Sequence, residues 1–366
     1  MTVPSWDART LRILLDLAPR AGLELPEGRP SRQRGIRERL AQNPLLMAPM
    51  AGVTDGAYRL MARAGGAGLA YTEMVSVAGI HYGGQKTWDL VLPVEGEAEV
   101  AVQLFGSRPE QFREAALEVA DRLQDRLALI DVNMACPVPK VTRKGEGSAL
   151  MDEPELAARI VRACLGQGRV PVSCKIRRGR RDGEEQAPEF ARVLADAGAS
   201  AIAVHGRSAS QLYRGRADWG VVRRVAEAVD VPVIGSGDVE DAAAAARMLG
   251  QTGAVGVMVA RGSYGDPWVF SSARALLDGG TPIVPTLAQR LAAFECHVRL
   301  LDATGAHLAR ARSLAGWYLK GLPHAAAWRD AAMRCTSLDD YLVLLGRVRE
   351  LIGVEGLGDR EGDAHG

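Results

Sequence analysis

The sequence predicts an α/β fold, a (β/α)8 TIM barrel with an appended C-terminal all-helical domain. Eight short apolar runs alternate with amphipathic segments between residues 43 and 281, and after residue 281 only the helical pattern continues. Glycine makes up 41 of the 366 residues, which fits many tight loops between regular elements. Runs that are apolar at nearly every position are typical of buried parallel strands, and eight strand–helix units are typical of a TIM barrel.

The predicted strands are spaced so that a helix fits after each of them. They cover residues 45–48, 68–72, 100–104, 127–132, 170–176, 201–204, 231–234 and 254–259. The helices between them carry start and stop signals, with Pro109 and Pro154 in first turns and Gly198 ending the helix before the sixth strand. A further helix is predicted over residues 238–250. A doubly wound sheet is the alternative fold, but no GxGxxG motif follows the first strand.

The pattern divides the chain into four segments. Residues 1–42 form an N-terminal extension, with an amphipathic stretch over 10–17 and then a connector rich in proline, glycine and arginine. Residues 43–281 form the barrel. Residues 282–354 form the helical domain, with helices predicted over 286–303, 307–321, 324–335 and 337–352. Residues 355–366 are predicted to be an acidic flexible tail.

Composition limits the classes of function. The chain is 47% hydrophobic, enough for a large core, and it has no run of 18 apolar residues that would predict a membrane span. Its five cysteines show no metal-type spacing, and their odd number argues against a disulfide framework. We therefore expect a cytoplasmic protein without a metal. The net charge of +1 is uninformative, because nucleic-acid binding needs a local basic patch rather than a basic average.

Active sites of TIM barrels lie at the C-terminal ends of the strands, so the residues there are the candidate site. After the seventh and eighth predicted strands, small residues stand at a helix start. Free backbone N–H groups and the helix dipole at such a place favour a phosphate. An equally good explanation is that the glycines only permit tight turns. The residues concerned are Ser236, Gly237, Asp238, Ala260 and Arg261.

Lys175 and Cys136 are the strongest candidates for chemistry. Lys175 lies inside an apolar strand, where an ammonium group needs an anionic partner. A phosphate or the N1/C2 edge of a reduced flavin would serve, and His205 would donate to the same anion. The structural alternative is that Lys175 forms an ion pair with a buried carboxylate, either Glu73 or Asp131. Cys136 follows the fourth strand, where a thiol at the barrel mouth can act as an acid.

Positive residues recur after the fourth, fifth and sixth strands. Each cluster alone is explained as solvated surface, but their common place after strands puts positive charge around the barrel mouth. The clusters are Lys140, Arg143 and Lys144, then Arg177, Arg178, Arg180 and Arg181, then Arg207, Arg214 and Arg216.

Short motifs around these positions carry a specific resemblance to a known protein family. They are Leu46–Asp55, Thr72–Met74, Val102–Leu104, Asp131–Pro137, Lys140–Val141, Cys174–Arg177, Val204–Arg207, and Pro232–Ile234 with Gly237 and Asp238. In these motifs the chain resembles the tRNA-dihydrouridine synthases, and most closely their bacterial B-type subgroup. The resemblance runs from about residue 43 to residue 351, in order, with one motif per strand.

The resemblance implies an enzyme that uses bound FMN and NADPH to reduce the C5=C6 bond of specific uridines in tRNA. Hydride would pass from FMN to C6, and Cys136 would give a proton to C5. The helical domain would bind tRNA. The implied FMN-binding residues are Pro49, Met50, Ala51, Gln103, Lys175, His205, Ser236, Gly237, Asp238, Ala260 and Arg261. The substrate residues are Asn133 and Arg177 at the uracil base, with Lys140, Arg143, Lys144 and Arg207 along the RNA.

Two other functions stay open. An FMN barrel reductase of a small molecule would share the cofactor residues, and a non-catalytic, flavin-loaded RNA-binding protein would share the basic mouth. The arginine-lined strand ends and the helical domain favour RNA, while Cys136 favours catalysis. We expect a monomer whose partner is tRNA, without a membrane or a metal.

Overall fold

The computed structural model describes Thr10, Ile13 and residues 35–353. The predicted amphipathic stretch over 10–17 lies outside the described residues except at those two positions. Most of the connector and the predicted acidic tail lie outside them as well.

The strands form one curled, fully parallel sheet in the order β2-β1-β9-β8-β7-β6-β5-β4-β3. Their bounds are β1 Leu45–Met47, β2 Leu69–Ala70, β3 Val75–Ser76, β4 Val100–Phe105, β5 Leu127–Met134, β6 Val172–Arg177, β7 Ala201–His205, β8 Val233–Ser236 and β9 Gly256–Val259. A parallel bridge between Tyr71 and Ala101 joins the β2 segment to β4 and closes the sheet on itself. The predicted TIM barrel is confirmed, with β3 as one short strand that the sequence reading missed.

Side chains alternate between two sides of each strand, as strand geometry requires. On β5, Val132 and Met134 pack outward against the barrel helices, whereas Leu129 joins the barrel interior. The same alternation holds on β6, where Cys174 and Ile176 belong to the outer cluster. Toward the C-terminal ends of these strands the intervening positions are polar, and they hold the buried polar residues Asp131, Asn133, Ser173, Lys175 and Arg177. The strands therefore carry polar groups inside the barrel toward their C-terminal ends.

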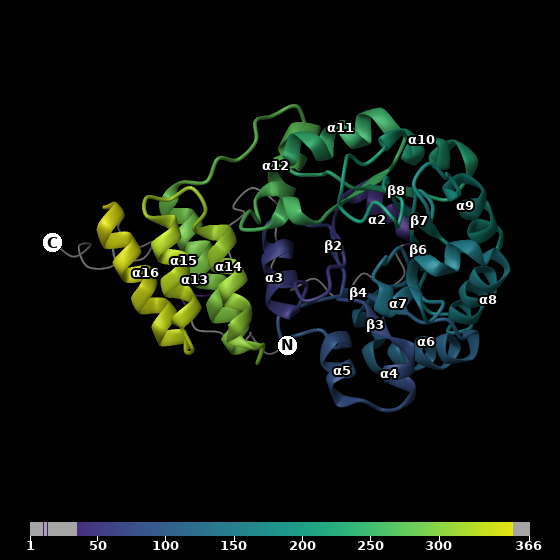
Figure 1. Cartoon of the computed structure of the whole chain (residues 1–366), viewed down its shortest axis with the longest axis horizontal. Coiled ribbons are helices and arrows are strands. Elements are labelled where there is room, and N and C mark those ends of the chain that lie inside the picture. The colour runs from purple at the N-terminus through teal and green to yellow at the C-terminus, as the bar shows by residue number, and fades with distance from the viewer. Residues whose placement is uncertain (1–9, 11–12, 14–34, 354–366) are drawn as a thin grey trace.

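Helices surround the sheet (Figure 1). They are α3 Gly56–Ala64, α6 Pro109–Leu123, α8 Pro154–Leu165, α9 Ala187–Asp196, α10 Trp219–Ala228, α11 Ala242–Thr252 and α12 Val269–Leu277. Pro109 and Pro154 begin their helices, as predicted. The helix predicted from residue 238 begins only at Ala242, because the Asp241 side chain caps it by accepting the Ala244 N–H at 2.6 Å.

Four short helices were not predicted, the four-residue α7 at Pro139–Thr142 and three others. Helix α2, Ile36–Gln42, lies in the segment read as a connector, and it buries Ile36 and Leu40 in the cluster that fills the barrel interior. Helices α4, Val77–His81, and α5, Gln85–Val91, lie between β3 and β4. These helices have at most seven residues, too short for a periodic pattern to identify them.

The C-terminal helices stand together beside α3 and α12 (Figure 1). They are α13 Leu287–Ala303, α14 Ala311–Tyr318, α15 Ala325–Arg334 and α16 Leu338–Ile352, with a 3-10 turn η4 at Leu308–Arg310. We call residues 287–352 the helical block. Its apolar core includes Ala57, Leu60 and Met61 of α3. Removing the block would therefore expose the apolar face of a barrel helix.

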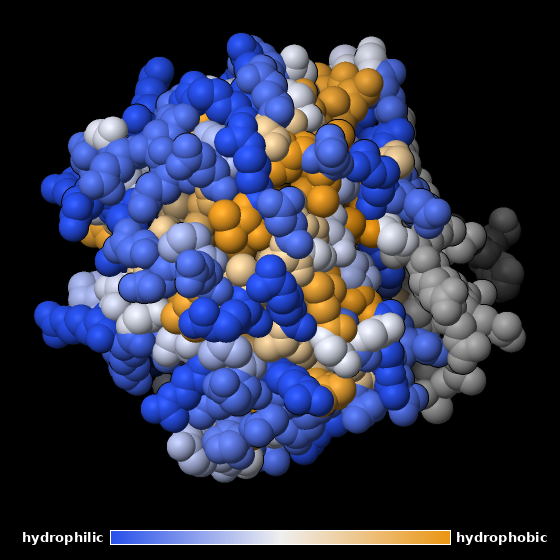
Figure 2. Space-filling view, turned by 90° about the vertical axis from the view of Figure 1, so that its right-hand side faces the viewer, coloured by the Kyte–Doolittle hydropathy of each residue, from blue (hydrophilic) through white to orange (hydrophobic). Residues whose placement is uncertain are grey.

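The outer barrel helices are amphipathic. Figure 2 turns the right-hand side of Figure 1 toward the viewer and shows mainly hydrophilic residues, with hydrophobic ones gathered along the middle. Helices α8 and α9 lie on this side, burying Ile160 and Phe190 while Arg159, Arg162 and Arg192 are exposed. Within the described residues, no helix combines the length and hydropathy that crossing a bilayer requires.

Candidate active site

A cavity of about 800 Å³ opens at the C-terminal ends of the barrel strands. Every residue predicted for FMN lines it, as do Cys136, Asn133 and Arg177. Lys140, Arg143, Lys144 and Arg207 do not line it. The structure thus brings together in one cavity residues that lie more than 200 positions apart in the chain, as the strand-end rule predicts.

A buried hydrogen-bond network forms the floor of the cavity. Asp131 accepts hydrogen bonds from Gln103 Nε2 and Ser173 Oγ, both at 2.6 Å. Gln103 Oε1 in turn accepts from Asn133 Nδ2 at 2.7 Å. Burial raises the pKa of Asp131 to about 6, although the two donors oppose that shift. The network locks Gln103 and Asn133 in single orientations, because each uses both ends of its amide group.

Asn133 fixes the loop that carries Cys136. Its Oδ1 accepts the backbone N–H groups of Ala135 at 3.1 Å and Cys136 at 2.9 Å, an Asx-type turn. Arg177 Nε also holds this loop by donating to the Ala135 carbonyl at 2.7 Å. The Cys136 side chain is partly exposed in the cavity. Burial raises its pKa, so the thiol is protonated at neutral pH and can donate a proton.

Lys175 carries a buried ammonium group that forms no ion pair with a carboxylate of the described residues. The side chain is 8% exposed and lines the cavity, and among the described residues no carboxylate lies within ion-pair distance of it. Burial, followed by the nearby Arg177, lowers its pKa to about 8. Of the two carboxylates predicted as alternative partners, Glu73 pairs with Arg310 instead. Asp131 forms no ion pair with Lys175 but interacts with it electrostatically, which opposes the fall in the pKa of Lys175. A buried cation facing a cavity favours an anionic ligand there.

His205 presents one ring nitrogen as a donor. Its Nδ1 accepts the backbone N–H of Arg207 at 3.2 Å. Burial and then the neighbouring cation Lys175 hold the pKa of His205 well below its usual value, so the ring is neutral. A neutral imidazole whose Nδ1 is an acceptor carries its hydrogen on Nε2. His205 therefore offers an N–H to the cavity without a titration near neutral pH.

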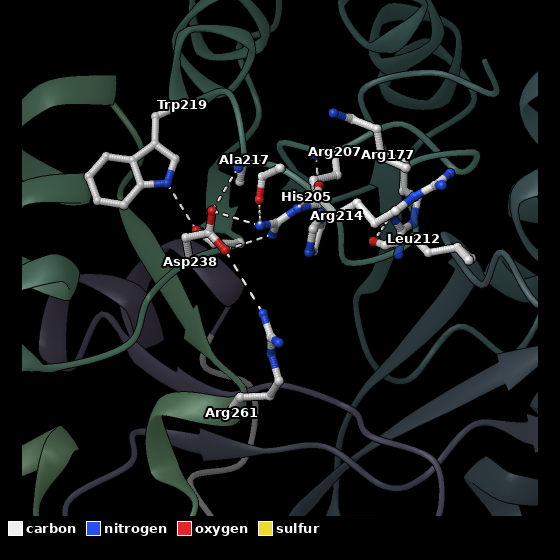
Figure 3. Close-up of polar contacts among 12 residues, drawn as sticks. Arg177, His205, Arg207, Leu212, Arg214, Ala217, Trp219, Asp238 and Arg261 are labelled. Carbon is white, nitrogen blue, oxygen red and sulfur yellow. Dashed lines mark hydrogen bonds and ion pairs between the residues drawn. The ribbon is translucent and has the colours of Figure 1, made fainter. Parts of the chain in front are cut away.

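Two buried arginines organise the loop between β7 and α10 (Figure 3). Arg177 Nη1 donates to the carbonyls of Ser208 at 2.9 Å and Leu212 at 3.2 Å. Arg207 donates to the Arg214 and Gly215 carbonyls and forms an ion pair with Asp238 at 2.7 Å. Arg207 is only 3% exposed. The guanidinium group of Arg207 is therefore buried against protein acceptors, and its predicted contact with RNA stays a prediction.

The β8 and β9 ends meet at one corner of the cavity. Gly237 has a φ of +104° and lies against Ala217, so a side chain there is excluded by both backbone and space. In the described part of the chain, the N–H groups of Gly237, Asp238, Arg261 and Gly262 donate to no backbone acceptor. Exposed amides in such a turn are suited to a phosphate. The predicted helix start at this place is wrong, since α11 begins beyond Asp241.

Asp238 was predicted to bind FMN, and its carboxylate instead contacts other residues of the protein. Burial alone would raise the pKa of its carboxyl group, but the Ala217 N–H and Arg207 together hold the pKa below its usual value. Its carboxylate accepts the Ala217 N–H at 2.7 Å and lies 3.9 Å from the exposed Arg261 guanidinium (Figure 3). Asp238 therefore offers the cavity its backbone N–H, while its carboxylate organises the β7–α10 loop.

The cavity includes residues that sequence reasoning missed. Tyr213 is 64% exposed on the β7–α10 loop, with the Arg261 guanidinium 5.3 Å from its ring. Tyr264 stacks on Trp317 of the helical block, with ring centroids 3.9 Å apart. Met74 and Glu240 also line the cavity. None of them follows a strand directly, so the strand-end rule gives no signal for them.

A closed parallel barrel whose C-terminal face combines a protonated thiol, buried cations and free amides defines a TIM-barrel protein with an enzyme-like site. The sequence matches the dihydrouridine synthase (Dus) family over residues 46–350, and the chain belongs to this family. Dihydrouridine synthases are oxidoreductases.

Related proteins are similar in sequence to this chain over most of their lengths. A probable tRNA-dihydrouridine synthase 1 of Synechocystis is 38% identical, covering 82% of this chain and 85% of that protein. The tRNA-dihydrouridine synthase B of Xanthomonas axonopodis is 36% identical, covering 82% and 91%. A probable tRNA-dihydrouridine synthase of Rickettsia conorii is 37% identical, covering 84% and 92%.

Proposed function

We propose that this chain is a tRNA-dihydrouridine synthase that reduces the C5=C6 bond of specific uridines in tRNA, with bound FMN as the flavin and NADPH as the electron donor. The observation that carries the proposal is the protonated Cys136 thiol in the same cavity as the unpaired Lys175 ammonium. The names of the relatives support tRNA as the substrate. Its direct test is the gain of two hydrogens by tRNA that lacks dihydrouridine.

The residues of the cavity fit FMN. Lys175 would meet the electron-rich edge of the flavin ring, and the neutral His205 would donate a hydrogen bond to the same anionic group. The free amides after β8 and β9, with Arg261, would hold the phosphate. FMN reduced by NADPH supplies the hydride for C6 of the uracil ring. Pro49, Met50, Ala51, Gln103 and Ser236 would form the remaining contacts, with Ala260 beside the phosphate.

The side chains of the cavity would then do three things. They exclude water from a uracil base that has left its stack, since only a flipped base reaches a buried site. Lys175 and Arg177 stabilise the negative charge that develops on the uracil carbonyl. Cys136 transfers its Sγ proton to C5, and the thiolate that remains is stabilised by the same two cations. Asn133 and Arg177, which fix the Cys136 loop, would also contact the base.

Exposed cations lie close to the same loop. Lys140 lies on the short helix α7, Pro139–Thr142, directly after the Cys136 loop, and Arg143 and Lys144 follow it; all three side chains are exposed. They do not line the cavity, so a contact with a bound small molecule would not use them. We propose that they neutralise RNA phosphates beside the target uridine.

Replacing Lys140, Arg143 and Lys144 together by alanine is expected to weaken tRNA binding and leave FMN binding unchanged. Each lost phosphate contact lowers the dependence of log Kd on log salt, so the slope should fall by about two to three. Binding of tRNA across a salt series measures this. The matched control replaces Arg159, Arg162 and Arg192, exposed on α8 and α9, by alanine. Equal slopes for the wild-type protein and the Lys140 triple variant would contradict an RNA contact at α7.

A further inference from the structure

Glu73 connects the barrel to the helical block. It follows β2 and is 7% exposed. One carboxylate oxygen, Oε2, accepts the backbone N–H of Gly52 at 2.6 Å. The other, Oε1, accepts from Arg310 Nη1 at 2.9 Å. A single buried carboxylate thus joins the loop after β1 to a cation of the helical block.

Arg310 holds a second point of the same loop. It ends the η4 turn just before α14, and its Nη1 also lies 3.1 Å from Asp55 Oδ2. Asp55 caps α3 by accepting the Tyr58 N–H at 2.9 Å. The carboxylates of Glu73, after β2, and Asp55, at the end of the segment between β1 and α3, therefore converge on one guanidinium group.

The segment between β1 and α3 forms a wall of the cavity. Met50 and Ala51 line the cavity, and both were predicted to contact FMN. The segment turns tightly, with the N–H groups of Val53 and Thr54 both donating to the Met50 carbonyl and Gly52 at a φ of +77°. Its Gly52 amide lies outside these internal bonds and donates to Glu73.

A second cavity, of about 450 Å³, lies on the other side of the segment. Gly52, Val53 and Asp55 line it from the barrel, and Arg310, Leu314 and Trp317 from the helical block. Packing behind the segment is therefore incomplete, and an unpacked wall is not held by close contacts. Across this gap, Arg310 forms polar contacts with Glu73 and Asp55, and Tyr58 of α3 forms aromatic contacts with His297 and Trp317.

We propose that Arg310 is a positioning residue, which acts through Glu73 and Asp55 to fix the Met50–Gly52 wall of the FMN site. The proposal rests on the proposed function, since it requires FMN to lie against this wall. It makes the helical block part of the flavin site in addition to its expected role in binding tRNA. The ion pairs of the half-buried Arg310 with Glu73 and Asp55 join the helical block to the barrel.

Arg310→Met tests the proposal, because methionine keeps most of the side-chain volume and removes the charge. We expect the FMN dissociation constant to rise about fivefold and the visible circular dichroism of bound FMN to change. Arg310→Lys should recover part of the affinity, since it keeps the cation. Glu73→Gln retains an acceptor for Gly52 but loses the ion pair, so adding it to Arg310→Met should cause little further loss. Arg334→Met, at an exposed pair on α15, is the matched control.

The outcomes separate the two proposals. Wild-type protein that binds no FMN would reject the proposed function itself. Wild-type protein that binds FMN, together with an Arg310→Met variant of unchanged FMN affinity and unchanged dichroism, would reject only the positioning role. A fall in Tm that is equal for the lysine and methionine variants, with the flavin spectrum unchanged, would likewise assign Arg310 a purely structural role.

Discussion

Cys136→Ala is expected to abolish formation of dihydrouridine while FMN stays bound and is still reduced by NADPH. A general acid in this position contributes a factor of about 10² to 10⁴ in rate. The Cys136 side chain lines the cavity and interacts with the backbone N–H of Val138, whereas the loop is held through Asn133 and Arg177. The loop should therefore keep its shape without the thiol. Single-turnover assays of tRNA, with flavin absorbance followed in parallel, measure both effects.

The matched control is Cys174→Ala. Cys174 lies on β6 beside Lys175 but faces outward, in the apolar cluster between the sheet and its helices. Its replacement should lower the free energy of unfolding and leave the rate of dihydrouridine formation near that of the wild type. Product formation by Cys136→Ala at the wild-type rate would remove this thiol from the mechanism.

Lys175→Met is expected to produce the second large effect, a loss of FMN affinity and of the rate of flavin reduction. Methionine retains the apolar stem of the side chain and removes an ammonium group that forms no ion pair with a carboxylate of the described residues. Removing a buried charge–anion contact costs about tenfold or more in affinity. Titration of the stripped protein with FMN, monitored by flavin fluorescence, measures the dissociation constant.

Lys175 should also make FMN binding depend on pH. Burial, with Arg177 nearby, lowers its pKa to about 8, so the ammonium form predominates below pH 8 and is lost above it. An anionic ligand binds the charged form, so affinity should fall as pH rises above about 8. His205 stays neutral throughout this range, and Asp131, with a pKa of about 6, stays ionised. A wild-type affinity that is flat between pH 7 and pH 10 would exclude a charge contact from Lys175.

The sequence predicted the site well where a residue follows a strand or lies inside it. Parallel strands end at one face of a barrel, so Gln103, Asn133, Lys175 and His205 could be assigned to one cavity without coordinates. The polar residues at alternate positions of β5 and β6 carry a further signal. Polar groups that recur every second residue within an apolar strand point into the barrel together.

Other features depend on contacts that no local pattern encodes. Arg207 directly follows a strand, like the cavity residues, yet it turns back to Asp238 and two loop carbonyls. Glu73 was considered as a partner of Lys175, but the ion pair with Arg310 spans 237 positions of sequence. Tyr213 lies in a loop, and Leu212 before it has a φ of +54°, which periodicity does not reveal.

The most direct test of the account uses purified protein and tRNA that lacks dihydrouridine. The visible spectrum is recorded, NADPH is added, and the RNA is analysed by mass spectrometry for a gain of two hydrogens at a uridine. We expect a yellow protein that bleaches with NADPH and a tRNA that gains the two hydrogens. A yellow protein that bleaches with NADPH but leaves the tRNA unchanged would contradict the proposed function and indicate an FMN barrel reductase of a small molecule.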